Sequence, residues 1–362
     1  MQKKIQKNIV YILAPAKTAT GGPEALHQLA NSLRENFNFT IKMVYLPQTV
    51  INPVHDNYKD YSINFTNIIE DNENNLLISP EHFEYLEELN KYKKIKKIIW
   101  WLSIDNYLNS RFRKKNSKQL RSVLKIPLAI IKFFNKITLF CFGILTEQDY
   151  VKLIYKYIKI KNFKELTGID FHFAQSNYAL TFLKKEFKNI SYLSDYQRKI
   201  FLKTPNTETV KKENLICYYP FKSNNFVKKI ISYNKNLKFI PIDNFSTNEI
   251  IKLLKKTKIY IDFGFHPGKD RIPREAVLMR NCIITNRKGS ALNNVDIPIN
   301  DEFKFYERYS NLEKINYKIL SIFQNYELEF LKFQNYYLKI LDEEKLFNKQ
   351  VRENFINIFE KT

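Results

Sequence analysis

Three basic side chains and one carboxylate that are suited to bind a nucleotide stand in one short segment: Lys269, Arg271, Arg274 and Glu275. Ammonium and guanidinium groups bind phosphate oxygens, and guanidinium groups do so in a bidentate manner. A carboxylate beside them is a suitable acceptor for the hydroxyl groups of a ribose. The combination predicts a ligand that carries a nucleoside diphosphate. The alternative is that Glu275 only complements a helix dipole and that the basic residues lie in a solvated loop.

The elements that must position these side chains are a strand, a turn and a helix. The run 258–262 is apolar enough for a buried parallel strand, and Pro267 and Gly268 then turn the chain. Pro273 is compatible with the first turn of a helix. The N-terminus of a helix attracts anions, because its first amide groups have no partner within the helix. We therefore expect a phosphate site at the start of this helix.

Strands and helices alternate through the rest of the chain, as is typical of α/β proteins with parallel sheets. In the first half, the predicted strands are 8–14, 43–46, 75–79, 97–102, 170–174 and 190–193, and the predicted helices begin after Gly22 and at Tyr178, the latter running to Phe187. In the second half, the predicted strands are 214–219, 238–242, 258–261 and 281–285, and the predicted helices are 225–234, 247–255 and most of 311–359.

A chain of 362 residues with this pattern predicts two domains. We expect an N-terminal domain at 1–202 that contains a basic, apolar insertion near 110–165. The polar run 203–213 is the best candidate for a linker. A second domain at 203–340 would follow, and a C-terminal helix at 341–362 would pack back on the first domain.

Gly21 and Gly22 follow the first predicted strand and precede a helix. Glycines allow close approach of the backbone to a ligand, and the amides of the adjacent helix favour an anion. A glycine pair in such a place is also a common turn. Neither a G-x-G-x-x-G motif nor a loop ending in Gly-Lys-Ser/Thr is present, so the usual dinucleotide and P-loop signatures are excluded.

Several segments of both halves resemble bacterial glycosyltransferases of the GT-B fold, of the type that builds surface polysaccharides such as O-antigen, capsule and lipooligosaccharide. The N-terminal segment 19–33 has a Gly-Gly loop before a helix with Leu-Ala-x-x-Leu, and Pro273-Arg-Glu-Ala276 resembles the start of the donor-sugar helix. The other matching segments are 100–106, 174–178, 192–196, 281–285 and 289–290.

The resemblance implies two Rossmann-like, parallel-sheet domains that face each other across a cleft. The C-terminal domain would bind a nucleotide-sugar, and the N-terminal domain would bind a glycan or a lipid-linked glycan. Glu275 would bind the donor ribose, and Gly21 and Gly22 would lie near the diphosphate. Lys269, Arg271 or Arg274 would neutralise the diphosphate. The amides of Gly289 and Ser290 could donate further hydrogen bonds to it.

The chain departs from the family at Pro267, because common retaining members carry an acidic residue there. His266 or Asp270 would take over its contacts with the sugar, which leaves retention and inversion both open. An inverting mechanism needs a base near the acceptor hydroxyl. Asp105 is the leading candidate and Asp195 the second. No Asp-x-Asp motif is present, so we expect no obligatory metal and no cofactor.

The net charge of +22 is concentrated in residues 91–164, where 19 lysines and arginines stand against three acidic residues, a net +16. A charge localised in this way indicates an anionic partner, either a membrane or a nucleic acid.

The apolar run 126–145 contains Lys132 and Lys136, and each would cost about 2.5–3.5 kcal/mol at the centre of a membrane. Residues 121–145 therefore fit a helix on an anionic membrane surface, and a buried core helix is the alternative.

Three functions are compatible with these observations. The first is a glycosyltransferase on the cytoplasmic face of the membrane, with no nucleic acid as a partner. The second is a basic nucleic-acid-binding protein, although no zinc-finger spacing or RNA-recognition signature is present. The third is a GT-B-fold epimerase of nucleotide-sugars. Three widely spaced cysteines favour a reducing compartment, and we expect no signal peptide.

Overall fold

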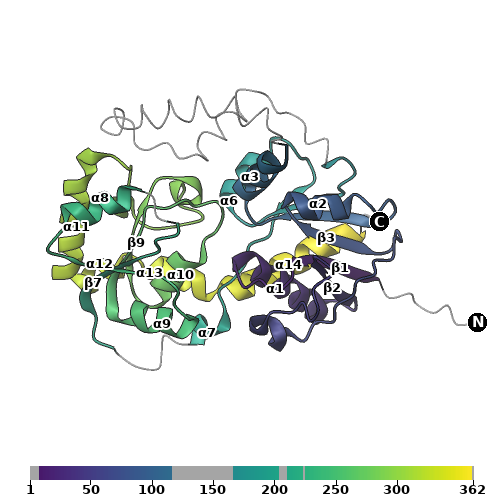
Figure 1. Cartoon of the computed structure of the whole chain (residues 1–362), viewed down its shortest axis with the longest axis horizontal. Coiled ribbons are helices and arrows are strands. Elements are labelled where there is room, and N and C mark those ends of the chain that lie inside the picture. Colours follow the sequence, from purple (N-terminus) through teal and green to yellow (C-terminus); the bar gives the residue numbers. More distant parts are fainter. Residues whose placement is uncertain (1–7, 116–165, 204–209, 223–224, 361–362) are drawn as a thin grey trace, which may run out of the picture. The chain divides into compact units, whose positions relative to one another are not determined.

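The computed structural model describes residues 8–115, 166–203, 210–222 and 225–360 (Figure 1). These residues divide into two compact units. The first unit comprises the described residues of 1–114, 154–196 and 344–362, and the second comprises those of 115–153 and 197–343. The main division lies between Tyr196 and Gln197, whereas the sequence placed it at residue 202. The predicted membrane-surface helix, 121–145, lies outside the described residues.

The first unit is built on a parallel sheet of six strands in the order β2-β1-β3-β4-β5-β6. The strands are β1 (Ile9–Pro15), β2 (Thr40–Leu46), β3 (Leu76–Pro80), β4 (Lys96–Trp101), β5 (Phe171–Ala174) and β6 (Ile190–Tyr192). The helices are α1 (Gly21–Asn36), the 3-10 helix η1 (Asp56–Tyr61), α2 (Phe83–Leu89), α3 (Ile104–Lys115), α6 (Asn177–Leu183) and α14 (Glu343–Glu360).

Helices α1 and α14 share one hydrophobic core with this sheet. In α1 the buried residues Leu26, Leu29 and Leu33 recur at helical spacing and lie in the same cluster as β1 and β2. In α14 the residues Phe347, Val351, Phe355 and Ile358 follow the same spacing, and all are buried. The last helix therefore completes the core of the first unit, because its apolar face has a partner there.

The second unit is built on a parallel sheet of five strands in the order β11-β10-β9-β7-β8. The strands are β7 (Glu213–Tyr218), β8 (Lys238–Pro241), β9 (Thr257–Asp262), β10 (Cys282–Asn286) and β11 (Lys304–Phe305). The helices are α7 (Lys199–Lys203), α8 (Asn225–Tyr233), α9 (Thr247–Lys256), α10 (Arg271–Leu278), α11 (Leu312–Gln324), α12 (Tyr326–Leu331) and α13 (Gln334–Leu341). The 3-10 helices are η4 (Gly289–Leu292), η5 (Asp301–Phe303) and η6 (Tyr309–Asn311).

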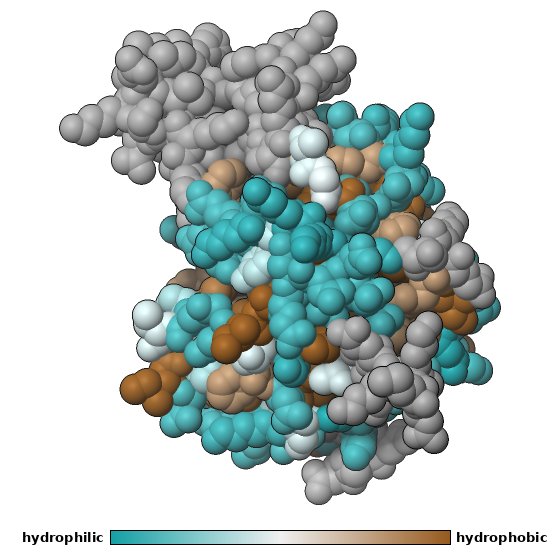
Figure 2. All heavy atoms as spheres, turned by 90° about the vertical axis from the view of Figure 1, so that its right-hand side faces the viewer, coloured by the Kyte–Doolittle hydropathy of each residue, from teal (hydrophilic) through white to brown (hydrophobic). Residues whose placement is uncertain are grey.

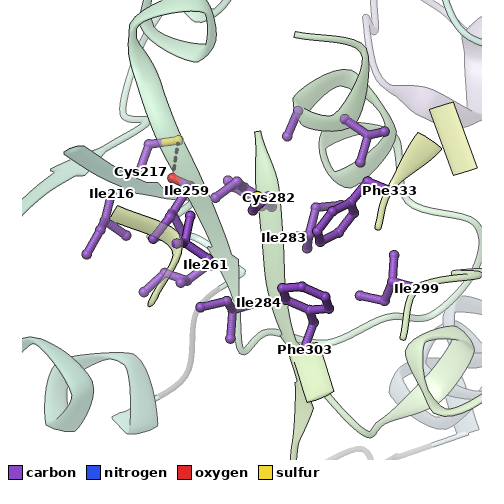
Figure 3. Packing of buried hydrophobic residues seen from close by; sticks show 14 of the residues in the cluster. Ile216, Cys217, Ile259, Ile261, Cys282, Ile283, Ile284, Ile299, Phe303 and Phe333 are labelled. Carbon is purple, nitrogen blue, oxygen red and sulfur yellow. Dashed lines mark hydrogen bonds between the residues drawn. The ribbon is translucent and has the colours of Figure 1, made fainter. Parts of the chain in front are cut away.

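The core of the second unit consists of isoleucine side chains from the central strands and aromatic rings from the elements around them (Figure 3). Ile216 of β7 is paired in register with Ile259 of β9, which is paired with Cys282 of β10. Phe303 and Phe333 close the opposite side, with ring centroids 4.6 Å apart. These strands are buried on both faces, as expected for parallel sheets covered by helices.

The predicted fold class is confirmed, since both units are α/β with parallel sheets. Several details differ from the sequence predictions. Gly21 and Gly22 form the first turn of α1 instead of preceding it, and α6 ends at Leu183, earlier than predicted. The two-residue strand β11 was not predicted, because so short a run has no recognisable period.

The surface of the described residues is mixed. Figure 2 shows one face on which hydrophilic side chains predominate and hydrophobic ones form small separate groups. Among the described residues, no helix combines the length and the apolar character needed to cross a membrane.

Candidate functional site

The polar loops of the second unit meet at one edge of its sheet. Strands β7, β9 and β10 are parallel, so the loops that follow them lie on the same edge, where α/β proteins bind ligands. The central loop, residues 263–270, joins β9 to α10. It lies directly against the loop after β7, because a Cβ atom on Gly264 would come within 2.6 Å of the Lys222 carbonyl oxygen. Only glycine fits at this contact.

A buried histidine holds the central loop together. The imidazole of His266 is fully buried, with Nδ1 3.1 Å from Asp270 Oδ2 and Nε2 3.3 Å from the carbonyl oxygen of Asp262. Thr285 Oγ1 lies 3.2 Å from the same Nε2. Burial alone would lower the pKa of His266, but the Asp262 and Asp270 carboxylates outweigh it and raise that pKa. The ring has no exposed surface and holds the loop in place, and a contact between His266 and the reacting sugar stays a prediction.

Gly289 and Ser290 close over this histidine. The Ser290 amide donates to the His266 carbonyl oxygen at 2.9 Å, and its hydroxyl donates to the Gly268 carbonyl oxygen at 2.6 Å. Gly289 has a φ of +53°, and a Cβ atom there would lie 2.0 Å from the His266 oxygen. The Ser290 amide thus bonds within the loops, and its role as a diphosphate donor stays a prediction.

Two of the predicted phosphate-binding cations are committed to an internal ion cluster. Arg274 is fully buried, and its Nη1 donates to Glu343 Oε2 at 2.7 Å. Its Nε and Nη2 donate to the carbonyl oxygens of Asp270 and Lys269. The Lys269 ammonium lies 2.6 Å from Glu343 Oε1. The partner of both cations is the first residue of α14, and binding of a diphosphate by either of them stays a prediction.

A different cation, Lys222, stands at the edge where a ligand would bind. Its ammonium lies 2.6 Å from Asp270 Oδ1, and the side chain keeps 38% of its surface exposed. Burial would raise the pKa of Asp270, but the charges of Lys222 and His266 outweigh it and lower that pKa to about 2. Burial alone would lower the pKa of Lys222, but the Asp270 carboxylate raises that pKa by more. The lysine is therefore charged at neutral pH. The sequence signal for Lys222 was a basic residue just after the strand 214–219.

Glu275 lies in the first half of α10, as predicted, and is 3% exposed. Arg198 Nη2 lies 3.6 Å from Glu275 Oε1, and Arg198 Nη1 donates to Thr247 Oγ1 at 3.1 Å. Burial raises the pKa of Glu275, while Arg198, Arg271 and Arg274 oppose that rise. Arg271 is the first residue of α10, and its carbonyl oxygen accepts from Gln197 Nε2 at 3.1 Å. The sequence analysis missed Arg198, because this residue does not directly follow a predicted strand.

A further acid–base pair follows β10 and β11. The Lys288 ammonium lies 2.7 Å from Glu307 Oε2, and the Glu307 side chain is fully buried. Asn286 Nδ2 donates both to Glu307 Oε1 at 2.8 Å and to the Gly264 carbonyl oxygen at 2.6 Å. Lys288 therefore adds a second partly exposed cation to the loops at this edge.

The remaining predicted residues belong to the first unit. Gly21 and Gly22 open α1, and a Cβ atom on Gly22 would meet Leu102 at 3.4 Å. Asp105 is 2% exposed and accepts from the Tyr178 hydroxyl at 3.2 Å. Asp195 is also buried, just after β6. The roles of these residues toward a donor or an acceptor stay predictions.

The first unit also contains a carboxyl group that the sequence analysis did not single out. Glu81 directly follows β3 and is 3% exposed, and its Oε2 accepts from the Leu102 amide at 2.9 Å. Burial raises the pKa of Glu81 to about 7, although the amides of Leu102 and Ser103 oppose the rise. The signal would have been an acidic residue at the carboxyl end of a predicted strand.

The described residues contain no group of three His, Cys, Asp or Glu side chains arranged to hold a metal ion. Three cations lie at the start of α10, Lys222, Arg198 and Arg271, and Lys288 lies in the loop after β10 at the same edge of the sheet. The dipole of that helix adds to their positive potential. Such an arrangement can bind a diphosphate, with Glu275 as an acceptor for neighbouring hydroxyl groups.

Comparison with protein-family models gives no match, and no curated protein matches the sequence. Solved structures do match. A mutant form of TarM of S. aureus, in complex with fondaparinux, alpha-GlcNAc-glycerol and UDP, is 11% identical with a TM-score of 0.48, over 80% of this chain. This chain spans 56% of the length of that protein.

Two other solved structures are similar over nearly their whole length. An α-glucosyltransferase in complex with UDP and a 13-mer DNA has a TM-score of 0.53 at 10% identity, over 96% of this chain and 98% of that one. The N-terminal domain of a trehalose-6-phosphate phosphatase from Candida albicans has a TM-score of 0.54 at 7% identity, over 98% of both chains. The likeness concerns the fold: the chain has the GT-B architecture of two Rossmann-like, parallel-sheet units.

Proposed function

We propose that the protein is a glycosyltransferase that binds a nucleotide-sugar at the carboxyl edge of its second sheet. The observation that carries the proposal is the position of Glu275 in α10, 3.6 Å from Arg198 and near Arg271. Lys222 stands at the end of β7 beside the same loop. The α-glucosyltransferase of similar fold was solved with UDP, which supports a nucleoside diphosphate as the ligand class.

In the proposed reaction, the bond between the anomeric carbon and the diphosphate oxygen breaks, and a bond from an acceptor hydroxyl oxygen to that carbon forms. The proton of the hydroxyl passes to a base, for which Asp105 remains the candidate. Negative charge develops on the leaving diphosphate. Lys222, Arg271 and the N-terminus of α10 would stabilise that charge, since preorganised cations and dipoles act most strongly in the transition state.

The proposed acceptor is a glycan of the cell surface or its lipid-linked precursor, and the proposed place of action is the cytoplasmic face of the membrane. The support is the net charge of +16 in residues 91–164, which suits an anionic lipid surface. The solved α-glucosyltransferase carries DNA in its complex. DNA is therefore the acceptor class against which a glycan must be compared.

The test follows a radiolabelled sugar from a panel of UDP-, GDP-, CDP- and dTDP-sugars to acceptors. The acceptors are a lipid-linked disaccharide, a free oligosaccharide and duplex DNA. The proposal expects label in a glycan and a nucleoside diphosphate released in equal amount. Label in DNA alone would contradict the proposed acceptor. Conversion of a nucleotide-sugar to its epimer without any acceptor would contradict transfer.

A further inference from the structure

A pocket of about 240 Å³ lies in the first unit, at the carboxyl end of the edge strand β2. Its floor and rim are formed by residues 47–53, and Tyr45, Phe65 and Asn67 complete its wall. None of the described residues that line it is charged. A neutral ligand therefore fits the pocket better than a phosphate or a carboxylate, which would need a cation as a partner.

The lining combines aromatic rings with side-chain amides. Tyr45 and Phe65 meet edge to face, with ring centroids 6.0 Å apart and an interplanar angle of 71°. Phe65 keeps 48% of its surface exposed, so its ring is accessible to a ligand. Gln48, Asn52 and Asn67 carry amides, which both donate and accept hydrogen bonds. Sugar rings present apolar C–H faces and hydroxyl groups that also donate and accept, so the two surfaces are complementary.

The aromatic wall is held rigidly by the start of α1. His27 Nδ1 lies 2.7 Å from the Pro23 carbonyl oxygen, and its Nε2 lies 2.8 Å from the Tyr45 hydroxyl. A carbonyl oxygen only accepts, so Nδ1 carries the proton, and the Tyr45 hydroxyl donates to Nε2. The ring of His27 also stacks on Tyr58 at 4.2 Å, and the Tyr58 hydroxyl donates to the Thr20 carbonyl oxygen at 3.2 Å. Burial lowers the pKa of His27 to about 4, which keeps this arrangement neutral at pH 7.

The rim of the pocket also contains a residue in the left-handed backbone region, which asparagine adopts more readily than most residues. Asn52 has a φ of +52°, in the left-handed region, and the next residue, Pro53, accepts at 2.8 Å from the amide of Lys17 in the loop after β1. A preformed pocket loses less entropy when a ligand binds.

We propose that this pocket binds one neutral pyranose ring of the acceptor glycan, with a ring face against Phe65 and hydroxyl groups at the amides of Asn52 and Asn67. This inference rests on the proposed function, because it assigns a subsite to the acceptor of that reaction. The pocket lies beside the loop after β1 that leads into α1.

The test is saturation-transfer NMR on the full chain with methyl α-glucopyranoside, methyl α-galactopyranoside, methyl α-mannopyranoside and methyl N-acetyl-α-glucosaminide. Ring protons of at least one glycoside should receive saturation from the wild-type protein. Phe65→Ala should lower the affinity for that glycoside at least about fivefold, through loss of ring contact. Asn67→Ala, which removes one exposed amide, should also lower the affinity for that glycoside.

The control is Tyr317→Ala, which removes another exposed aromatic ring, on α11 in the second unit. It should leave the glycoside signal unchanged. No saturation of any glycoside by the wild-type protein, or equal effects of Phe65→Ala and Tyr317→Ala, would overturn the proposal. Nucleotide-sugar binding, measured separately, reports on the second unit. Its absence would overturn the proposed function, whereas a wild-type protein that binds nucleotide-sugars but no glycoside would overturn only the pocket.

Discussion

Arg274 and Glu343 form a buried ion pair between α10 and the first residue of α14, with Nη1 and Oε2 2.7 Å apart. Their side chains are 0% and 4% exposed. Lys269, from the central loop, shares the same carboxylate. One acidic side chain at the end of the second unit thus compensates two buried cations of the same unit. A buried pair of this kind is costly to break, because the remaining charge loses its partner.

We expect Glu343→Ala to lower the free energy of unfolding by about 3–5 kcal/mol, the usual effect of removing one partner of a buried pair. Urea titrations followed by circular dichroism measure this change. The matched control is Glu327→Ala, which breaks the exposed pair between Arg280 and Glu327, also at 2.7 Å. There we expect a change below about 1 kcal/mol. Equal losses in the two variants would show that burial of the Glu343 cluster has no energetic consequence.

Gly289→Ala should destabilise the protein more than Gly168→Ala does. Both glycines have a positive φ, +53° and +83°, so an alanine is strained at either position. Only Gly289 has an obstacle, since its Cβ would lie 2.0 Å from the His266 oxygen, whereas nothing lies within 4 Å at Gly168. The difference between the two melting temperatures therefore isolates the clash. Indistinguishable melting temperatures would mean that the Gly289 contact is not as close as described.

The strand, loop and helix around residue 270 were predictable from the sequence, because an apolar run, a Pro-Gly turn and a proline in a first helical turn are local signals. The roles of the cations were not predictable. Arg274 and Glu343 are 69 residues apart in the sequence, and no local pattern indicates that they meet. Lys222 likewise becomes part of the site only because β7 and β9 are neighbours in the sheet. Sequence patterns thus locate the loops, and long-range packing decides which side chains remain available to a ligand.

Glu81 should make stability depend on pH between about 4.5 and 7. Its pKa is raised from 4.5 to about 7 in the folded protein, so folding favours the protonated form. The contribution is fully present below pH 4.5 and is lost as the pH rises through 7. Since one pKa unit corresponds to about 1.4 kcal/mol, the loss should be about 3 kcal/mol.

The measurement for Glu81 is the free energy of unfolding at pH 4.5, 6 and 8 for the wild type and for Glu81→Gln. The amide of glutamine does not titrate, and its oxygen still accepts from the Leu102 amide. The free energy of unfolding of the variant should therefore decline less with rising pH than that of the wild type. The contributions of the histidines are the same in both proteins. Parallel pH profiles would show that Glu81 ionises normally.

Lys222→Met should slow turnover more than it weakens ground-state binding of the nucleotide-sugar. The reason is that negative charge grows on the leaving diphosphate, and removal of one preorganised donor typically costs about 100-fold in kcat. Lys252→Met, which removes an exposed lysine from α9 of the same unit, controls for the change in net charge. A kcat of Lys222→Met equal to that of the control would place Lys222 outside the reaction.

The most direct test of the central claim is calorimetric titration of the wild type and Glu275→Ala with the panel of nucleotide-sugars. The account predicts that the wild type binds at least one of them. It also predicts that Glu275→Ala weakens this binding by about 1.5–3 kcal/mol, through loss of a charge-assisted hydrogen bond to the ribose, with an unchanged circular dichroism spectrum. Equal affinity of the two proteins, or no binding by the wild type, would contradict the assignment of this sheet edge as the nucleotide-sugar site.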